Sequence, residues 1–265
     1  FRFVKRSIVR SEQALTFLKR LGLTEPDATA NAIDNILPKY GLSQGDQIGE
    51  AEYLADVGAI MGGLNTGSQP NREQLIAKAQ VIPFIKATNA HSGETTLVAP
   101  NKTWLPTREI KVFVKGNPNV WLVDQHIAAE FREGLVELGA RDAVKPQFRK
   151  PGWDGYVRIA NLHGWHQRGL DGFDTDADVE ELKFALTHPN LERSLYIWNE
   201  TLLPHVRLLS GKVETSTRQG FSNARTAFKY SKLGEQVRRL AWVPTRDMQW
   251  KTPGEIEREE LHADL

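Results

Sequence analysis

A six-residue phrase that occurs twice limits the folds open to this chain. Residues 104–109 read WLPTRE, and residues 242–247 read WVPTRD. A second pair of phrases agrees with the first, because FLKRLGLTEPD at 17–27 is echoed by FREGLVELGARD at 131–142. Since a Leu-Gly phrase precedes a Trp-x-Pro phrase each time, the sequence predicts two divergent tandem units.

The two predicted units cover 1–125 and 126–265, and each is helical before it reaches a Trp-x-Pro strand element. Proline fixes the backbone as a strand ends, and tryptophan supplies a large apolar side chain that can anchor a core. We expect one tryptophan and one proline of each repeat to act in this structural way: Trp104, Pro106, Trp242 and Pro244.

Composition sets the outer bounds of what the chain can be. Its 265 residues can hold one large domain or two ordinary ones, and 40% hydrophobic with 25% charged residues is typical of a globular protein. Because Cys is absent, disulfides, thiolate zinc sites and Cys nucleophiles are excluded. No apolar run approaches the ~18 residues of a membrane span and no signal peptide opens the chain, so we expect a cytoplasmic protein without membrane contact. The chain opens without Met in the phrase FRFVKRS, and we expect it to be a piece of a longer protein.

The first part of the chain reads as helical. Apolar spacing and capping residues predict helices at 11–22, 24–38, 48–64 and 71–80. Ser11, Thr24 and Asn71 are the expected N-terminal caps. Pro38 is expected to end the second helix, because proline lacks the N–H that continues the hydrogen-bond ladder.

The pattern changes from residue 81 on. β-Branched and aromatic residues separated by polar turns predict short strands, followed by a buried strand at 119–124. The phrase REIKVFVKG at 108–116 fits either a helix or a strand. Residues 125–138 carry the apolar spacing of one amphipathic helix.

The second half of the chain mixes the apolar spacing of helices with that of strands. The acids in DTDADVEELKFALTH, from Asp174 on, are expected in and before the first turn of a helix, where they complement its positive end. A longer helix at 189–209 is expected to turn its large apolar side chains inward and to kink or end at Pro204. The side chains expected inward are Leu195, Trp198, Leu202 and Leu203.

The last fifty residues alternate strand and helix signals. Residues 212–230 are β-like, Ser231 is expected to cap a helix to residue 240, and AWVPT is expected to be a strand. TPGEIEREEL at 252–261 is expected to close the chain as a short helix. The predicted fold class is therefore α+β, helix-rich, with small antiparallel sheets.

Two phrases resemble known ligand motifs and depart from them. NAIDN at 31–35 resembles the Asn-x-x-Asp helix of GHKL-type ATPases, but its nearest companion, DVGAI from Asp56, has Ile60 where the second glycine must let adenine approach. DGFDTDADVEE alternates acids like a calcium loop, but Val179 replaces the glycine and Ala185 the final glutamate. We interpret both as ordinary helix segments.

Histidine offers the other candidate for chemistry. His163 and His166 stand three apart in a Gly/Trp loop, but no acid or third histidine lies nearby at ligand spacing. An enzyme would have to assemble its site from residues distant in sequence, such as these two with Asp174. No nucleophile elbow and no Walker A lysine is present. We therefore assign no residue to catalysis, to a cofactor or to a metal.

Basic residues gather near the C-terminal end. Between Lys212 and Lys251 there are nine Lys/Arg against three acids, interleaved with five aromatic residues, as in some nucleic-acid surfaces. The aromatic residues also occupy positions where the strand and helix patterns predict core side chains. An acidic stretch at 255–264 could neutralise the basic charge. The stretch is therefore expected to be a solvated face or a contact to a partner domain, with a nucleic-acid surface as the alternative; its basic residues are Arg218, Arg225, Lys229, Lys232, Arg238 and Arg239.

Several longer phrases, taken in their order, resemble a known family. They are LGLTEPDATANAIDNILPKY, TWLPTREIKVFVKGNPNVWLVD, EFREGLVELGARD, LERSLYIWNETLL and RLAWVPTRDMQWKTPGEI. Together they resemble the region downstream of the ATPase domain in large bacterial sacsin-like, GHKL-type ATP-binding proteins. In such proteins an N-terminal nucleotide-binding domain precedes long repeat-bearing regions, and some carry a further domain associated with restriction or phage defence.

The resemblance implies an interior, non-catalytic piece whose ATP-site motifs would lie before residue 1. No active residue of the family maps onto this chain. The implied role is an interaction or transducing module that couples a chaperone-like ATPase domain to a client protein or to neighbouring domains of the same parent chain. The alternative is a nucleic-acid-binding module of a restriction or phage-defence protein.

Overall fold

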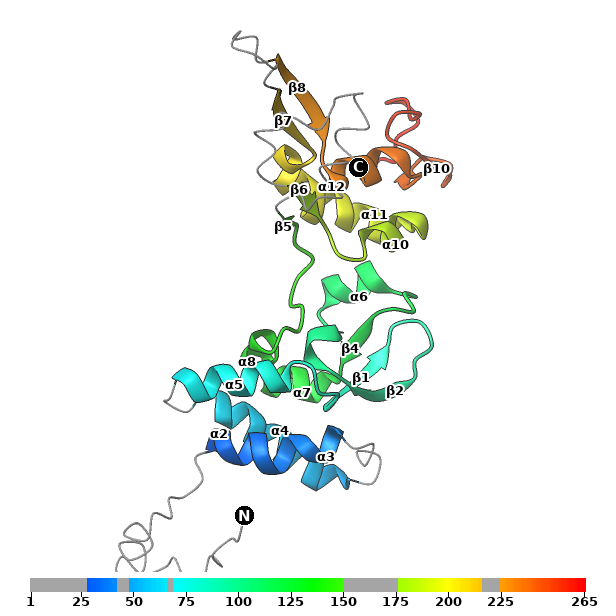
Figure 1. Ribbon diagram of the computed structural model, residues 1–265. Coiled ribbons are helices and arrows are strands. Elements are labelled where there is room, and N and C mark those ends of the chain that lie inside the picture. Colours follow the sequence, from blue (N-terminus) through cyan, green and yellow to red (C-terminus); the bar gives the residue numbers. More distant parts are fainter. Residues whose placement is uncertain (1–27, 42–47, 66–68, 150–175, 216–224) are drawn as a thin grey trace, which may run out of the picture. The chain divides into compact units, whose positions relative to one another are not determined.

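The structure is a computed structural model, and it describes residues 28–41, 48–65, 69–149, 176–215 and 225–265 (Figure 1). The fold is α+β and about half helical, as predicted. The chain forms two compact units, which interleave along the sequence. Unit 1 takes 1–87, 96–103 and 124–140, and unit 2 takes 88–95, 104–123 and 141–265. The predicted tandem division at residue 125 stays a prediction.

Unit 1 is built mainly from helices. They are α2 (Ala28–Asn31), the π-helical turn η1 (Ala32–Ile36), α3 (Leu37–Gly41), α4 (Glu50–Leu64), α5 (Gln69–Ala79), α7 (Gln125–Glu130) and α8 (Arg132–Glu137). Fully buried side chains from several of these helices make its core, among them Leu37, Ile60, Leu75 and Leu135. The predicted helix at 48–64 is confirmed by α4.

Pro38 does not end the second helix, contrary to the prediction. The helix runs on through α3, and the residues just before the proline form a π turn in which the N–H of Leu37 donates to the carbonyl of Ala32. A π turn adds one residue to the ring that each hydrogen bond closes. The wider turn makes room for the ring of Pro38, which also lacks an N–H, so that the helix continues past the proline.

Two other helix boundaries differ from the predicted ones. α5 begins at Gln69, so Asn71 lies inside it and does not cap it. The helix predicted at 125–138 is divided in two, because Phe131 leaves helical geometry with φ −120° and ψ 27°. Asp124 caps the first half by accepting the N–H of His126 at 2.9 Å.

Four short strands form a mixed sheet in the order β2-β1-β4-β3. They are β1 (Ile85–Asn89), β2 (Thr95–Val98), β3 (Thr103–Trp104) and β4 (Trp121–Val123), with the 3-10 turn η3 (Pro100–Lys102) before β3. The strands predicted from residue 81 and at 119–124 are confirmed. The sheet is mixed, whereas only antiparallel sheets were predicted.

The ambiguous phrase at 108–116 is a helix in unit 2. α6 (Arg108–Val114) begins at Thr107, whose hydroxyl accepts the N–H of Ile110 at 3.2 Å. The hydroxyl satisfies one of the N–H groups that the first turn of a helix leaves without a partner. Thr107 belongs to the first WLPTRE phrase, so that phrase supplies both a buried strand and a helix cap.

The rest of unit 2 alternates helices with two-stranded antiparallel sheets. The helical elements are α10 (Leu182–Thr187), α11 (Leu191–Tyr196), the π segment η4 (Ile197–Leu202), the 3-10 segment η5 (Leu203–Leu208) and α12 (Lys232–Arg239). The strands are β5 (Gln147–Arg149), β6 (Asp176–Asp178), β7 (Ser210–Thr215), β8 (Arg225–Tyr230), β9 (Val243–Pro244) and β10 (Trp250–Lys251). They pair as β5-β6, β7-β8 and β9-β10.

The π segment η4 changes which face of the long helix is buried. Leu202 is buried and Leu195 half-buried, but Trp198 is 39% exposed and Leu203 58% exposed, so their predicted inward orientation is wrong. A π turn rotates the side chains that follow it away from the 3.6-residue spacing. Ile197 is buried instead of Trp198. The predicted kink at Pro204 is confirmed, because the backbone leaves helical geometry at His205.

The helix starts predicted near the acidic residues are wrong, whereas two predicted elements after residue 230 are confirmed. The acids Asp176 and Asp178 lie on β6, and the helix after them starts only at Leu182. Residues 252–261 form turns instead of a helix, with the Glu255 carboxylate accepting the hydroxyl of Thr252 at 2.8 Å. The predicted cap at Ser231 is confirmed by α12, and the predicted strand in AWVPT by β9.

Candidate binding pocket in unit 2

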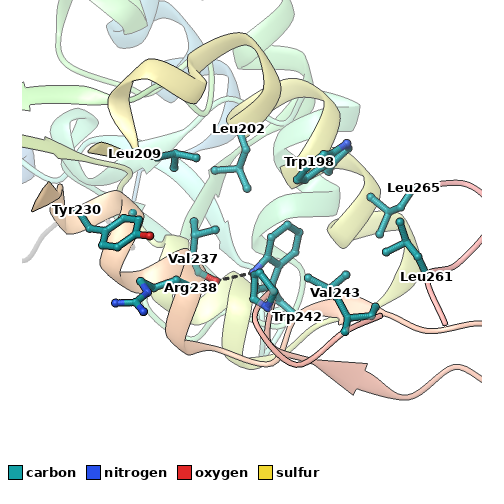
Figure 2. Close-up of a pocket in the computed structure, with 13 residues that line it drawn as sticks. Trp198, Leu202, Leu209, Tyr230, Val237, Arg238, Trp242, Val243, Leu261 and Leu265 are labelled. Carbon is teal, nitrogen blue, oxygen red and sulfur yellow. Dashed lines mark hydrogen bonds between the residues drawn. The ribbon is translucent and has the colours of Figure 1, made fainter. Parts of the chain in front are cut away.

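Unit 2 contains a pocket with a volume of about 420 Å³. Four separate stretches of the chain line it: η4 with the residue after η5, the join of β8 and α12, the start of β9, and the turns after residue 252 (Figure 2). Its lining residues are Trp198, Leu202, Leu209, Tyr230, Gly234, Val237, Arg238, Trp242, Val243, Pro253, Ile256, Leu261 and Leu265. Apart from Arg238 and the hydroxyl of Tyr230, their side chains are apolar, so the pocket suits an apolar group.

Trp242 fixes one wall of this pocket. Its indole is only 1% exposed, and the indole N–H donates to the carbonyl of Val237 at 2.9 Å (Figure 2). Val237 lies in the last turn of α12, where carbonyls lack a helical partner, so the indole caps that helix. The hydroxyl of Ser194 donates to the Trp242 carbonyl at 2.8 Å. These bonds hold the tryptophan between α11 and α12.

Two partly exposed aromatic rings stand at the pocket. Trp198 is 39% exposed, and its ring centroid lies 6.5 Å from that of Trp242 at an interplanar angle of 31°. Tyr230 is 48% exposed, and the guanidinium of Arg238 lies 4.6 Å from its ring centroid. Large aromatic side chains that keep exposed surface are common where proteins bind partners.

The basic residues predicted as a surface have different surroundings. Lys232 forms an ion pair with Asp178, and Arg239 forms one with Glu235 at 2.8 Å. Arg238 has no carboxylate partner among the described residues. Arg218 lies outside the described residues, and the side chains of Arg225 and Lys229 on β8 do too. The only described members of the set are thus the three on α12.

The two Trp-x-Pro phrases occupy the same core. Trp104 and Trp242 are both buried, and both belong to the apolar cluster of unit 2, whereas the sequence analysis assigned one to each of two cores. Pro244 is buried on β9. Pro106 follows β3 and is half-buried. The two phrases therefore supply side chains to one folded unit.

Arg141 holds the first phrase in place. Its carbonyl accepts the N–H of Leu105 at 2.8 Å, and its guanidinium lies 5.7 Å from the centroid of the Trp104 ring. The same guanidinium donates to both carboxylate oxygens of Glu180, at 2.6 and 2.7 Å. This two-pronged geometry is the strongest that an Arg–carboxylate pair offers, so we assign Arg141 a structural role.

The other residues considered for chemistry are structural or undescribed. His163, His166 and Asp174 lie outside the described residues. Among the residues that the structure does describe, no three His, Asp or Glu side chains are grouped so that they could hold a metal ion. In the NAIDN segment, the Asn35 amide donates to the Asn31 side chain at 2.9 Å within η1.

Asp56, from the DVGAI phrase, belongs to a buried polar network in unit 1. It accepts the ammonium of Lys39 at 2.9 Å and the hydroxyl of Tyr40 at 3.1 Å. Hydrogen bonds to Glu52 and then Asp56 raise the pKa of Lys39. Burial, and then the charge of Asp56, raises the pKa of Tyr40. The network is satisfied internally, which favours a structural role for this carboxylate.

Arg193 is a buried cation in unit 2. It is 2% exposed, and its guanidinium donates to the carbonyls of Val112, Lys115 and His188. Two of those carbonyls lie at the C-terminal end of α6, which carries partial negative charge. Burial lowers the pKa of Arg193. The residue joins α11 to α6 and stands apart from the pocket lining.

Comparison of the chain with protein-family models, with curated proteins and with solved structures gave no match. Of the helices that the structure describes, none combines the length and the apolar character needed to cross a membrane.

The pocket was not predicted from the sequence. Its lining is contributed by residues spread from 198 to 265, and no local pattern joins them. One signal pointed toward it, namely the aromatic residues interleaved with basic ones before residue 251. That signal also fits a nucleic-acid or partner surface, and Trp242 and Arg238 of that stretch line the pocket.

Proposed function

We propose that this chain is a non-catalytic interaction module of a larger sacsin-like, chaperone-like ATPase, and that the unit 2 pocket receives an apolar segment of a protein partner. The observation that carries the proposal is the pocket itself, with an almost wholly apolar lining and two aromatic rings that keep exposed surface. Burying an apolar side chain there removes apolar area from water on both partners.

The volume of the pocket supports an occupant of side-chain size. About 420 Å³ lies within the ~300–1,000 Å³ range of sites that enclose small groups. One or two large side chains fit such a space, as the central anchor of an interface does. A client protein or a neighbouring domain of the parent chain could supply that anchor.

The charges on α12 favour a protein partner over nucleic acid. Nucleic-acid affinity comes mainly from cations that are free to neutralise phosphates. Lys232 and Arg239 each have a carboxylate beside them, so their net field is reduced. The nucleic-acid alternative predicts binding of duplex or single strand that falls steeply as salt rises, and the same assay can measure it.

The test uses fluorescein-labelled peptides that end in GSGS followed by every pair drawn from Leu, Ile, Phe and Trp, in free-acid and amidated forms. Fluorescence anisotropy with the whole chain is expected to show saturable binding of the best members. Val237→Phe fills the pocket from a buried lining position and is expected to abolish that binding. Val206→Phe is the matched control, because Val206 is 57% exposed and does not line the pocket.

Two results would overturn the proposal. One is the lack of saturable binding by any peptide in either form. The other is peptide binding that survives Val237→Phe with the fold intact. If that variant fails to fold, Leu265→Trp fills the same pocket from a half-buried position at the last turn and gives the same comparison.

A further inference from the structure

Among the described residues that line the unit 2 pocket, one is charged, and it stands at one end. Figure 2 shows Tyr230 and Arg238 together on one side of the pocket, with Leu261 and Leu265 on the opposite side. A ligand that fills the pocket therefore meets apolar walls along most of its length, with Arg238 at one end.

Arg238 is available to bind a ligand. It is exposed, it has no carboxylate partner among the described residues, and its neighbours Lys232 and Arg239 are both ion-paired. Its one described interaction is with the face of the Tyr230 ring, 4.6 Å away. Stacking on a ring leaves the N–H donors at the edge of a guanidinium free to form hydrogen bonds.

Those donors match a carboxylate. A guanidinium presents two parallel N–H groups that fit the two oxygens of a carboxylate, and such charge-assisted bonds are stronger than neutral ones. A ligand with a carboxylate next to its apolar part would complement both features of the pocket.

Resting on the proposed function, we infer that the partner segment in this pocket is the apolar C-terminus of a protein chain, with its terminal carboxylate on Arg238. A single cation at one end of an otherwise apolar lining suits the end of a chain, where an apolar residue carries the terminal carboxylate, better than an apolar segment passing through. A C-terminal residue also carries its carboxylate and its apolar side chain on the same carbon atom. The carboxylate can therefore reach Arg238 at the end of the pocket while the side chain lies against the apolar lining.

The test compares the free-acid and amidated forms of each peptide described above by anisotropy. A hydrogen bond to a charged group contributes more than a neutral one, so the amide is expected to bind about tenfold more weakly than the acid. Arg238→Gln is expected to weaken the acid by the same factor and to leave the amide unchanged. Arg239→Gln, at the adjacent exposed position, is the matched control and is expected to change neither.

The outcomes separate this inference from the proposed function. Equal binding of acid and amide, abolished by Val237→Phe, would refute the role of the carboxylate and leave the proposed function standing. Binding of neither form would overturn both. A third arm uses GSGSDLFGS with an amidated end; if it binds as tightly as the free acids and depends on Arg238, an internal acid is the partner and the terminal carboxylate is refuted.

Discussion

Replacing Trp242 by alanine tests the packing of unit 2 most severely. The indole is almost fully buried, it caps α12 through the carbonyl of Val237, and it forms one wall of the pocket. Removing a buried tryptophan costs about 3–5 kcal/mol in other proteins. The lost hydrogen bond belongs to that cost and contributes about 1 kcal/mol of it.

The position of Trp242 beside the pocket indicates where in the range of about 3–5 kcal/mol the cost of Trp242→Ala should lie. The cavity left by the indole would open into the existing pocket, where water can enter, and this reduces the penalty for empty space. We therefore expect Trp242→Ala to lower the free energy of unfolding by about 4 kcal/mol. In domains of about 150–250 residues each kcal/mol shifts Tm by about 2–4 °C, so the expected decrease in Tm is roughly 8–16 °C.

Calorimetry and urea unfolding monitored by circular dichroism measure the two quantities. Trp242→Phe is the control, because it keeps a large ring and loses the N–H that caps α12, and it should cost about 1–2 kcal/mol. A Tm of Trp242→Ala within about 2 °C of the parent would refute the assignment of Trp242 to the core.

Three further predictions test other parts of the fold. Arg193→Met keeps much of the side-chain length but leaves the carbonyls of Val112, Lys115 and His188 without their donor. Urea unfolding should show that the free energy of unfolding decreases by about 2–4 kcal/mol. An unchanged free energy of unfolding would contradict the buried role of Arg193. Gly234→Ala would place a Cβ atom 2.0 Å from the carbonyl oxygen of Leu209 and should destabilise unit 2 by about 2 kcal/mol or more. Gly62→Ala has open space on α4 and should stabilise by about 0.5–1 kcal/mol, so equal effects of the two would refute the local packing. Burial raises the pKa of Tyr53 and of Tyr196 to about 12. The unfolded chain loses these protons near pH 10, so above that pH it binds fewer protons than the folded chain. The free energy of unfolding should therefore fall between about pH 10 and 12. Tyr53→Phe and Tyr196→Phe should each flatten that fall, and an unchanged pH profile would contradict the prediction.

The sequence predicted elements whose signals are local. α4 and α12 follow from apolar spacing, and α12 also from its Ser231 cap, while β4 and β9 follow from short apolar runs. These signals act within one or two turns of chain, so tertiary packing had little to change. The α+β class could be predicted from their mixture.

The failures at Pro38 and at Trp198 share a cause in helical irregularity. Pro38 and Pro204 look alike in sequence, yet one lies in a continuous helix after a π turn and the other starts a kinked 3-10 segment. The π segment before Pro204 also leaves Trp198 partly exposed, which simple spacing cannot foresee. Packing within each unit decides between such alternatives.

The pocket could not be predicted for a different reason. The basic and aromatic residues before residue 251 pointed to a binding surface, and that surface stays a prediction. What the sequence hides is that, within the part of the chain that the structure describes, Lys232 and Arg239 lie beside acids while Arg238 does not. The partner of Lys232, Asp178, is distant in sequence, so only the fold reveals which cation is left for a ligand.

The most direct measurement of the central claim is methyl NMR of the whole chain during titration with the best free-acid peptide. The account predicts saturable shifts for Leu202, Val237 and Leu261, which line the pocket, and none for the buried Leu75 and Leu135 of unit 1. Saturable shifts confined to residues away from the pocket, or no shifts at all, would contradict the claim that unit 2 binds an apolar protein segment there.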